Sequence, residues 1–177
     1  MTALKNLVVG IGILLLLVFI LGFALPSEYR VERSIVIDAP PQKVFEHIHD
    51  LRDWRAWGVW FKRDPDMTVT YSGPEKSVGR MSKWESESEG SGEMKVLAIT
   101  PNQNIKYSLY FPDFDMGSTG ELVLEEKDGK SVVTWMSYGD VGSNPIDHYF
   151  AVFMDSLIGP DFEAGLDNLK VLVEAQG

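Results

Sequence analysis

The longest uninterrupted apolar stretch of the chain runs from Leu7 to Leu25 and contains no charged residue. As a helix, at about 1.5 Å per residue, it would be roughly 28 Å long, which is close to the ~30 Å hydrocarbon core of a bilayer. A core helix of a soluble protein normally has a polar face, which this stretch lacks. The pattern therefore predicts a transmembrane anchor over residues 1–26, ended by Pro26, and a water-soluble domain over residues 27–177.

A cleavable signal peptide is the alternative interpretation of the same stretch. Lys5 supplies a positive residue ahead of it, and Gly22-Phe23-Ala24 resembles a small-x-small cleavage site. The apolar run is longer than the usual 7–15 residues of a signal peptide, which favours an uncleaved anchor. The flanking charges, Lys5 on one side and Arg30 and Arg33 on the other, do not fix the orientation. A short N-terminal tail before an apolar run resembles a signal anchor and favours export of the domain.

Alternation of apolar and polar residues predicts most of the soluble domain to be β-sheet. Tyr29–Ala39 alternates with β-branched residues and reads as a strand, and apolar residues at helical spacing then predict two short helices between Pro40 and Phe61. Short turns separate the strands that follow, and Asp128-Gly129 indicates a tight hairpin between the last two. The six further strands expected are Met67–Ser72, Gly79–Glu87, Gly92–Thr100, Asn104–Phe111, Gly117–Glu126 and Ser131–Gly139.

A broad apolar stripe from Ile146 to Val173 predicts a long C-terminal helix, which Gly159-Pro160 should bend or interrupt. The element order therefore predicts an α+β fold, with an antiparallel sheet of about seven strands wrapped around this helix. The helix is the only large apolar element that can cover the sheet. A cavity remains between the two unless large side chains fill it, and such a cavity can hold an apolar ligand.

Two segments resemble the START-like (SRPBCC) superfamily, in particular its polyketide cyclase/dehydrase-like group. VERSIVIDAPPQKVFEHIHDLRDWRAW (residues 31–57) is similar to the opening strand, paired helices and tryptophans of that group, and IGPDFEAGLDNLK (residues 158–170) to its terminal helix. The resemblance covers about residues 28–175 and implies a helix-grip fold. It implies no single activity, because the group includes lipid carriers, receptors, cyclases and chaperone cofactors. Some bacterial members carry a membrane-spanning segment ahead of the domain, so the resemblance also implies a single-pass protein of the bacterial inner membrane.

Charge and composition narrow the range of partners. The formal net charge is −10, and Lys5 is the only charged side chain before Glu28, so the acidic excess lies in the soluble domain. This argues against nucleic acid and against broad adhesion to anionic lipid. The chain has no cysteine, which excludes disulfides, thiolate metal sites and a cysteine nucleophile. His47 and His49 would point to different sides of a helix, so no metal site is expected. We also predict no cofactor.

Aromatic side chains are the candidates for lining a cavity, because indole N–H and phenol O–H groups supply polar contacts on a large apolar surface. Core packing is the alternative for each of them. The sequence has no nucleophile elbow, P-loop or dinucleotide fingerprint. Only Tyr107, Tyr110, Asp147 and His148 are candidates for moving protons, and we predict no catalytic residues. The predicted ligand-binding residues are Trp57, Trp60, Trp84, Tyr107, Tyr110, Trp135, Phe150 and Met154.

Three functions remain open on the sequence. The favoured one is a membrane-tethered module that binds a hydrophobic small molecule: a lipid, fatty acid, quinone or polyketide-like compound. A tether raises the effective concentration of the binder near ligands that partition into the bilayer. The second is an interaction protein whose own aromatic residues fill the cavity and whose acidic surface meets a membrane-protein partner. The third is an enzyme of the cyclase or dehydratase type.

Overall fold

Seven antiparallel strands form one sheet in the order β1-β7-β6-β5-β4-β3-β2. The computed structural model describes residues 2–176. All strands except β1 pair with a neighbour in sequence, and β1 forms one edge of the sheet by pairing with β7. The strands are β1 (Glu28–Ile37), β2 (Thr68–Ser72), β3 (Met81–Ser86), β4 (Gly90–Thr100), β5 (Asn104–Phe111), β6 (Met116–Lys127) and β7 (Lys130–Asp140).

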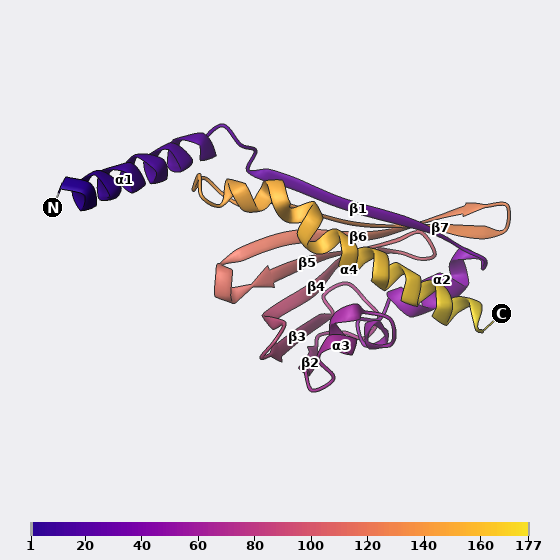
Figure 1. The fold of residues 1–177 in the computed structure, drawn as a ribbon. Coiled ribbons are helices and arrows are strands. Elements are labelled where there is room, and N and C mark those ends of the chain that lie inside the picture. Colours follow the sequence, from indigo (N-terminus) through magenta and orange to yellow (C-terminus); the bar gives the residue numbers. More distant parts are fainter. Residues whose placement is uncertain (1, 177) are drawn as a thin grey trace.

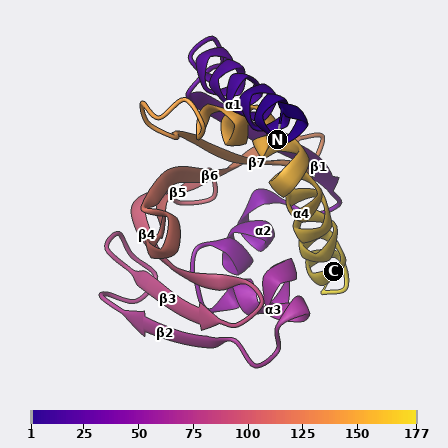
Figure 2. The same cartoon turned by 60° about the vertical axis from the view of Figure 1, so that its left-hand side comes forward.

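The helices of the domain lie on the concave side of this sheet. Figure 1 shows α4 crossing the sheet, and Figure 2 shows the strands curling from β1 and β7 round to β2 with α2, α3 and α4 inside the curve. A further helix, α1, extends away from the domain (Figure 1). The helices are α1 (Thr2–Gly22), α2 (Pro41–Ile48), α3 (Val59–Arg63) and α4 (His148–Glu174), with the 3-10 turns η1 (Asp53–Ala56) and η2 (Pro112–Phe114).

The α+β fold expected from the sequence is confirmed, and every expected strand lies within two residues of its predicted bounds. Of the predicted bend or interruption at Gly159-Pro160, the interruption is wrong, because α4 continues through Pro160. Proline removes one backbone hydrogen bond, but buried side chains such as Phe162 and Leu166 hold the helix on the sheet beyond it.

Gly159 has a packing role at this point of α4. A Cβ atom there would lie 2.2 Å from Nη2 of Arg33, so only glycine lets this guanidinium lie across the helix. Arg33 forms ion pairs with Asp155 and Glu163, one turn to either side of Gly159. The hydrogen bond with Arg33 is the main reason that the pKa of Asp155 is lowered from its ordinary value. β1 is thereby fastened to the middle of α4.

An aromatic cluster forms the centre of the core. The ring of Trp135 stacks on Phe162 with centroids 4.2 Å apart and also contacts Trp54 and Trp57 edge-on. Gly165 makes this possible, since a Cβ atom there would lie 2.7 Å from Trp135 Cζ3. The indole nitrogens of Trp54 and Trp57 donate to backbone carbonyls in the last turn of α2, so these buried polar groups are satisfied.

The C-terminal end of α1 is attached to the start of α4. Tyr149 Oη donates to the carbonyl of Val18 (2.7 Å), and Nδ1 of His148 lies 2.9 Å from the carbonyl of Gly22. Gly22 lies so close to Pro145 that a Cβ atom would be 2.2 Å from the proline carbonyl oxygen. Elsewhere α1 is exposed, and its most apolar window is 0% buried. The helix is long and apolar enough to cross a membrane, a property that an N-terminal signal sequence shares.

Candidate functional site

A cavity of about 340 Å³ lies between the sheet and α4. One row of paired residues, Ser82, Met94, Leu109 and Ser118, crosses four strands of its wall. α4 supplies the opposite wall. The apolar lining residues are Leu51, Trp54, Trp60, Phe61, Met67, Val69, Trp84, Met94, Leu109, Phe111, Met116, Trp135, Met154, Ile158 and Phe162, with Tyr29 and Tyr107 as the phenols.

Glycines in the sheet keep the cavity open despite its many aromatic residues. Tyr107 is paired directly with Gly120, and its ring covers that glycine so closely that a Cβ atom would lie 2.1 Å from Cζ. Trp84 covers its partner Gly92 in the same way, at 2.2 Å from Cζ2. These rings lie along the wall over their cross-strand partners. They therefore line the cavity without filling it.

The polar groups inside the cavity are neutral hydroxyls. Tyr107 Oη accepts a hydrogen bond from Trp135 Nε1 at 2.7 Å, and burial raises the pKa of Tyr107 well above its ordinary value. Among residues 2–176 this is the hydroxyl's only hydrogen bond, so its proton is free to be donated into the cavity. Ser82, Ser118 and Ser137 add three more hydroxyls to the wall.

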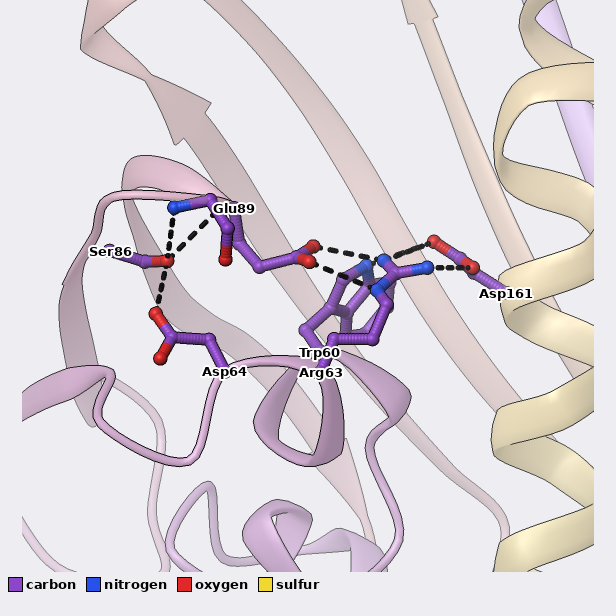
Figure 3. A network of polar contacts seen from close by, with 7 residues as sticks. Trp60, Arg63, Asp64, Ser86, Glu89 and Asp161 are labelled. Atoms are coloured by element: carbon purple, nitrogen blue, oxygen red, sulfur yellow. Dashed lines mark hydrogen bonds and ion pairs between the residues drawn. The ribbon is translucent and has the colours of Figure 1, made fainter.

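Charged groups of the lining gather at one edge of the cavity, where α3 meets α4 and the β3–β4 turn (Figure 3). Both carboxylate oxygens of Glu89 accept from Arg63, at 2.9 and 3.0 Å, and both of Asp161 do so at 2.7 and 2.9 Å. Asp161 also accepts from Trp60 Nε1 at 3.1 Å. The hydrogen bonds to Asp161, and next those to Glu89, raise the pKa of Arg63. Because the Arg63 side chain is 46% exposed, this edge reaches the surface.

A second contact holds the β3–β4 turn in place beside this network. Ser86 Oγ donates to a carboxylate oxygen of Asp64, directly after α3, and accepts the backbone N–H of Glu89 (Figure 3). Three elements that are far apart in the sequence are therefore joined at the edge of the cavity. We call Arg63, Glu89 and Asp161 the edge network.

Five of the eight predicted ligand-binding residues line the cavity and three do not. Trp57 is fully buried behind the wall, where it packs against Trp135. Tyr110 points to the outer face, because strand residues alternate and its neighbours Leu109 and Phe111 face inward; its hydroxyl donates to Asp115. Phe150 is 51% exposed on α4. The residues that do line the cavity are Trp60, Trp84, Tyr107, Trp135 and Met154.

The sequence analysis missed the edge network and Trp54. Arg63 and Asp161 are 98 residues apart, and no local pattern brings them together. Trp54 belongs to the same run of tryptophans as Trp57 and Trp60, so the spacing of three residues was a usable signal for it.

The candidate residues for proton transfer do not converge. Tyr107 lines the cavity, whereas Tyr110 is on the outer face and His148 is at the attachment of α1. Asp147 directly precedes His148, at the N-cap of α4. Within the part of the chain that the structure describes, these four side chains do not form a common proton-transfer site.

Comparison with solved structures shows the fold to be a known one. Protein MLL2253 from Mesorhizobium loti is similar with a TM-score of 0.63 and 15% identity, over 84% of this chain and 98% of that one. A protein from Thermobifida fusca gives a TM-score of 0.65 and 18% identity, over 81% and 92%. The di-domain ARO/CYC protein BexL from the BE-7585A biosynthetic pathway gives 0.60 and 16%, over 84% of this chain and 50% of BexL.

Family comparison agrees with this structural likeness and with the resemblance seen in the sequence. The search among curated proteins gives no significant match. The family model for polyketide cyclase / dehydrase and lipid transport matches residues 28–174, which is nearly the whole domain after α1. The chain therefore belongs to the polyketide cyclase/dehydrase and lipid transport family of SRPBCC domains.

Proposed function

We propose that this domain binds a hydrophobic small molecule or lipid in the cavity between the sheet and α4. The observation that carries the proposal is the cavity itself, about 340 Å³ in volume, with an apolar wall and no charge away from its edge. This volume is within the range of about 300–1,000 Å³ that is typical of small-molecule sites. Binding is consistent with the family, whose members include lipid transport proteins.

The polar groups of the wall narrow the class of ligand. Tyr107 offers a buried hydroxyl proton that has no acceptor among the described residues, and the serines nearby are neutral. A ligand that brings a carbonyl, quinone or ether oxygen to Tyr107 would satisfy that donor, whereas a carboxylate in this position would be a buried, unpaired charge. The preferred ligand is therefore an apolar molecule with an acceptor oxygen at its buried end.

Helix α1 supports a membrane location for this binding. It is 21 residues long and apolar, and its most apolar segment is entirely exposed, so the helix is not part of the domain's core. We propose that residues 1–26 anchor the domain of residues 27–177 in a bilayer. The anchor would keep the cavity near ligands that partition into lipid.

Native mass spectrometry tests the binding proposal. The domain starting at Ser27 would be expressed without the anchor, purified without detergent and incubated with a membrane lipid extract. We expect a stoichiometric apolar adduct that is released on denaturation. An unchanged apo mass would overturn the proposal and favour an interaction protein with a membrane-protein partner.

Three variants locate the bound molecule and its acceptor oxygen. Ser118→Phe places a phenyl group in the cavity and should abolish the adduct, whereas Thr119→Phe, on the opposite face of the same strand, should retain it. Tyr107→Phe should weaken binding of a hydrophobic ketone by about threefold to tenfold, the value of one neutral hydrogen bond, and leave the matching hydrocarbon unaffected. Equal effects on both probes would rule out the proposed role of Tyr107.

A further inference from the structure

The first half of α4 carries an exposed apolar stripe that the cavity does not explain. Phe150, Phe153 and Leu157 are spaced by three and four residues, so they lie on one side of the helix, and Ile146 lies in the turn just before it. Between 42% and 58% of the surface of each is exposed. The outer face of a helix on a soluble domain is normally polar. The stripe therefore indicates an apolar partner for this side of the helix.

Helix α1 reaches the domain where this stripe begins. Its last turn is held by Tyr149 and His148, immediately before Phe150, and by its close approach to Pro145. The end of α1 therefore lies beside the start of α4, where the stripe begins (Figure 1). A membrane that contains α1 would reach the domain at this end.

The β5–β6 turn adds a second exposed apolar group at the same end of the sheet. Phe114 is 74% exposed, and it lies between Phe111 and Met116, which are paired with each other and line the cavity. The register places this turn at the end of the sheet where β1 begins and β7 ends, beside the junction with α1. Exposed apolar residues and cavity-lining residues thus share the same segments.

We propose that Phe114 and the stripe of Ile146, Phe150, Phe153 and Leu157 lie in the interfacial layer of the bilayer that α1 spans. This proposal rests on the proposed anchor. Met154 and Ile158, beside the stripe on α4, line the cavity, so this half of α4 separates the cavity from the membrane.

The charges of this end favour zwitterionic lipid. Asp113 and Asp115 flank Phe114, and Asp147 lies between Ile146 and the rest of the stripe. Carboxylates next to the interface are repelled by anionic headgroups, so apolar burial is the attractive contribution. The experiment therefore uses phosphatidylcholine bilayers.

Spin labels on the full chain in phosphatidylcholine nanodiscs test the proposal. The chain has no cysteine, so single-cysteine variants carry one label each. Labels at Phe153→Cys and Phe114→Cys should be more accessible to oxygen, which enters lipid, than to a water-soluble nickel complex. Val171→Cys is the matched control: it is 69% exposed, and it lies eighteen residues or five turns after Phe153 on the same side of α4, about 27 Å away. This label should be accessible to nickel.

A label at Leu14→Cys separates the two proposals. If Leu14 is in lipid while Phe153 and Phe114 are in water, the anchor stands and the membrane contact of the domain is refuted. If Leu14 is in water, the anchor fails and this inference fails with it. Low accessibility of Phe153 to both reagents indicates a protein contact and refutes the lipid contact. A lipid signal at Val171 as well would refute the arrangement in which only this end of the domain touches the bilayer.

Discussion

Replacing Gly120 with alanine tests the geometry of the cavity wall. The new Cβ atom would lie within 2.4 Å of Cζ, Cε2 and Oη of Tyr107, so the buried ring must move. Overpacking of this kind costs about 1–3 kcal/mol. Movement of the ring also breaks the hydrogen bond from Trp135 Nε1, and a buried donor without a partner costs about 1–3 kcal/mol more. We expect Gly120→Ala to lower the free energy of unfolding by about 2–6 kcal/mol.

Gly117→Ala is the matched control on the same strand. Its nearest neighbour would be the carbonyl oxygen of Leu109 at 3.7 Å, an ordinary contact, and neither glycine has a positive φ. Its effect should stay within about 1 kcal/mol, since removing a glycine also restricts the unfolded chain. The assay is urea unfolding of the full chain in micelles, followed by tryptophan fluorescence and near-UV circular dichroism.

A second substitution identifies the clash as the cause. In a Tyr107→Leu background, which removes the ring, Gly120→Ala should cost much less than it does in the native chain, so the two changes should not be additive. Equal effects of Gly120→Ala and Gly117→Ala in the native background would refute the position of the Tyr107 ring. The argument that the rings line the cavity without filling it would then lose its basis.

Three further predictions concern ionisable groups. Arg63→Met leaves two carboxylates without their cation and should destabilise the domain by about 1 kcal/mol in urea unfolding. The effect should be smaller at high salt, which screens these charges. The control Lys130→Met, at an exposed ion pair, should change stability by less than about 0.5 kcal/mol. Burial raises the pKa of Tyr107, so the unfolded state loses the phenol proton first as pH rises. The contribution of this group to the free energy of unfolding is fully present below pH 10.0 and is lost as pH rises above it. Tyr107→Phe should therefore reduce the loss of stability in alkaline unfolding curves. The hydrogen bond with Arg33 is the main cause of the lowered pKa of Asp155, so the ionised carboxylate stabilises the folded state at pH values above 3.8. This contribution is lost as pH falls below 3.8 and through the lowered pKa. Acid unfolding of Asp155→Asn should therefore depend less on pH.

Local patterns were sufficient to predict the sheet because each strand is bounded by turn residues that can be recognised without tertiary contacts. Asp128-Gly129 shows this well, since both residues have the positive φ that a tight hairpin requires. The same period-two rule could have excluded Tyr110 from the cavity once Tyr107 was taken as facing inward. The alternation commits Trp84 and Trp135 each to one face of its strand without showing which face is concave, and in the structure both lie in the cavity wall.

Whether the cavity was open could not be predicted from the sequence. That outcome depends on Gly120 and Gly92 lying directly opposite Tyr107 and Trp84, and this pairing is a matter of register between strands. The edge network depends in the same way on the packing of α4 against α3. Neither relation has a signature within one segment. The sequence therefore favoured a ligand-binding cavity but left open a cavity filled by its own aromatic residues.

The two halves of α4 differ in a way that links the cavity to the proposed membrane contact. A helix that only covers a sheet needs one apolar stripe, and after Pro160 α4 has this character, with Val171 as its one large exposed apolar residue within the described chain. Before Pro160 the helix is apolar on the cavity side and also along the stripe. The change occurs at Gly159-Pro160, where Arg33 crosses the helix and fastens it to β1. The fold alone does not require the second stripe, but a bilayer at the α1 end of the domain does.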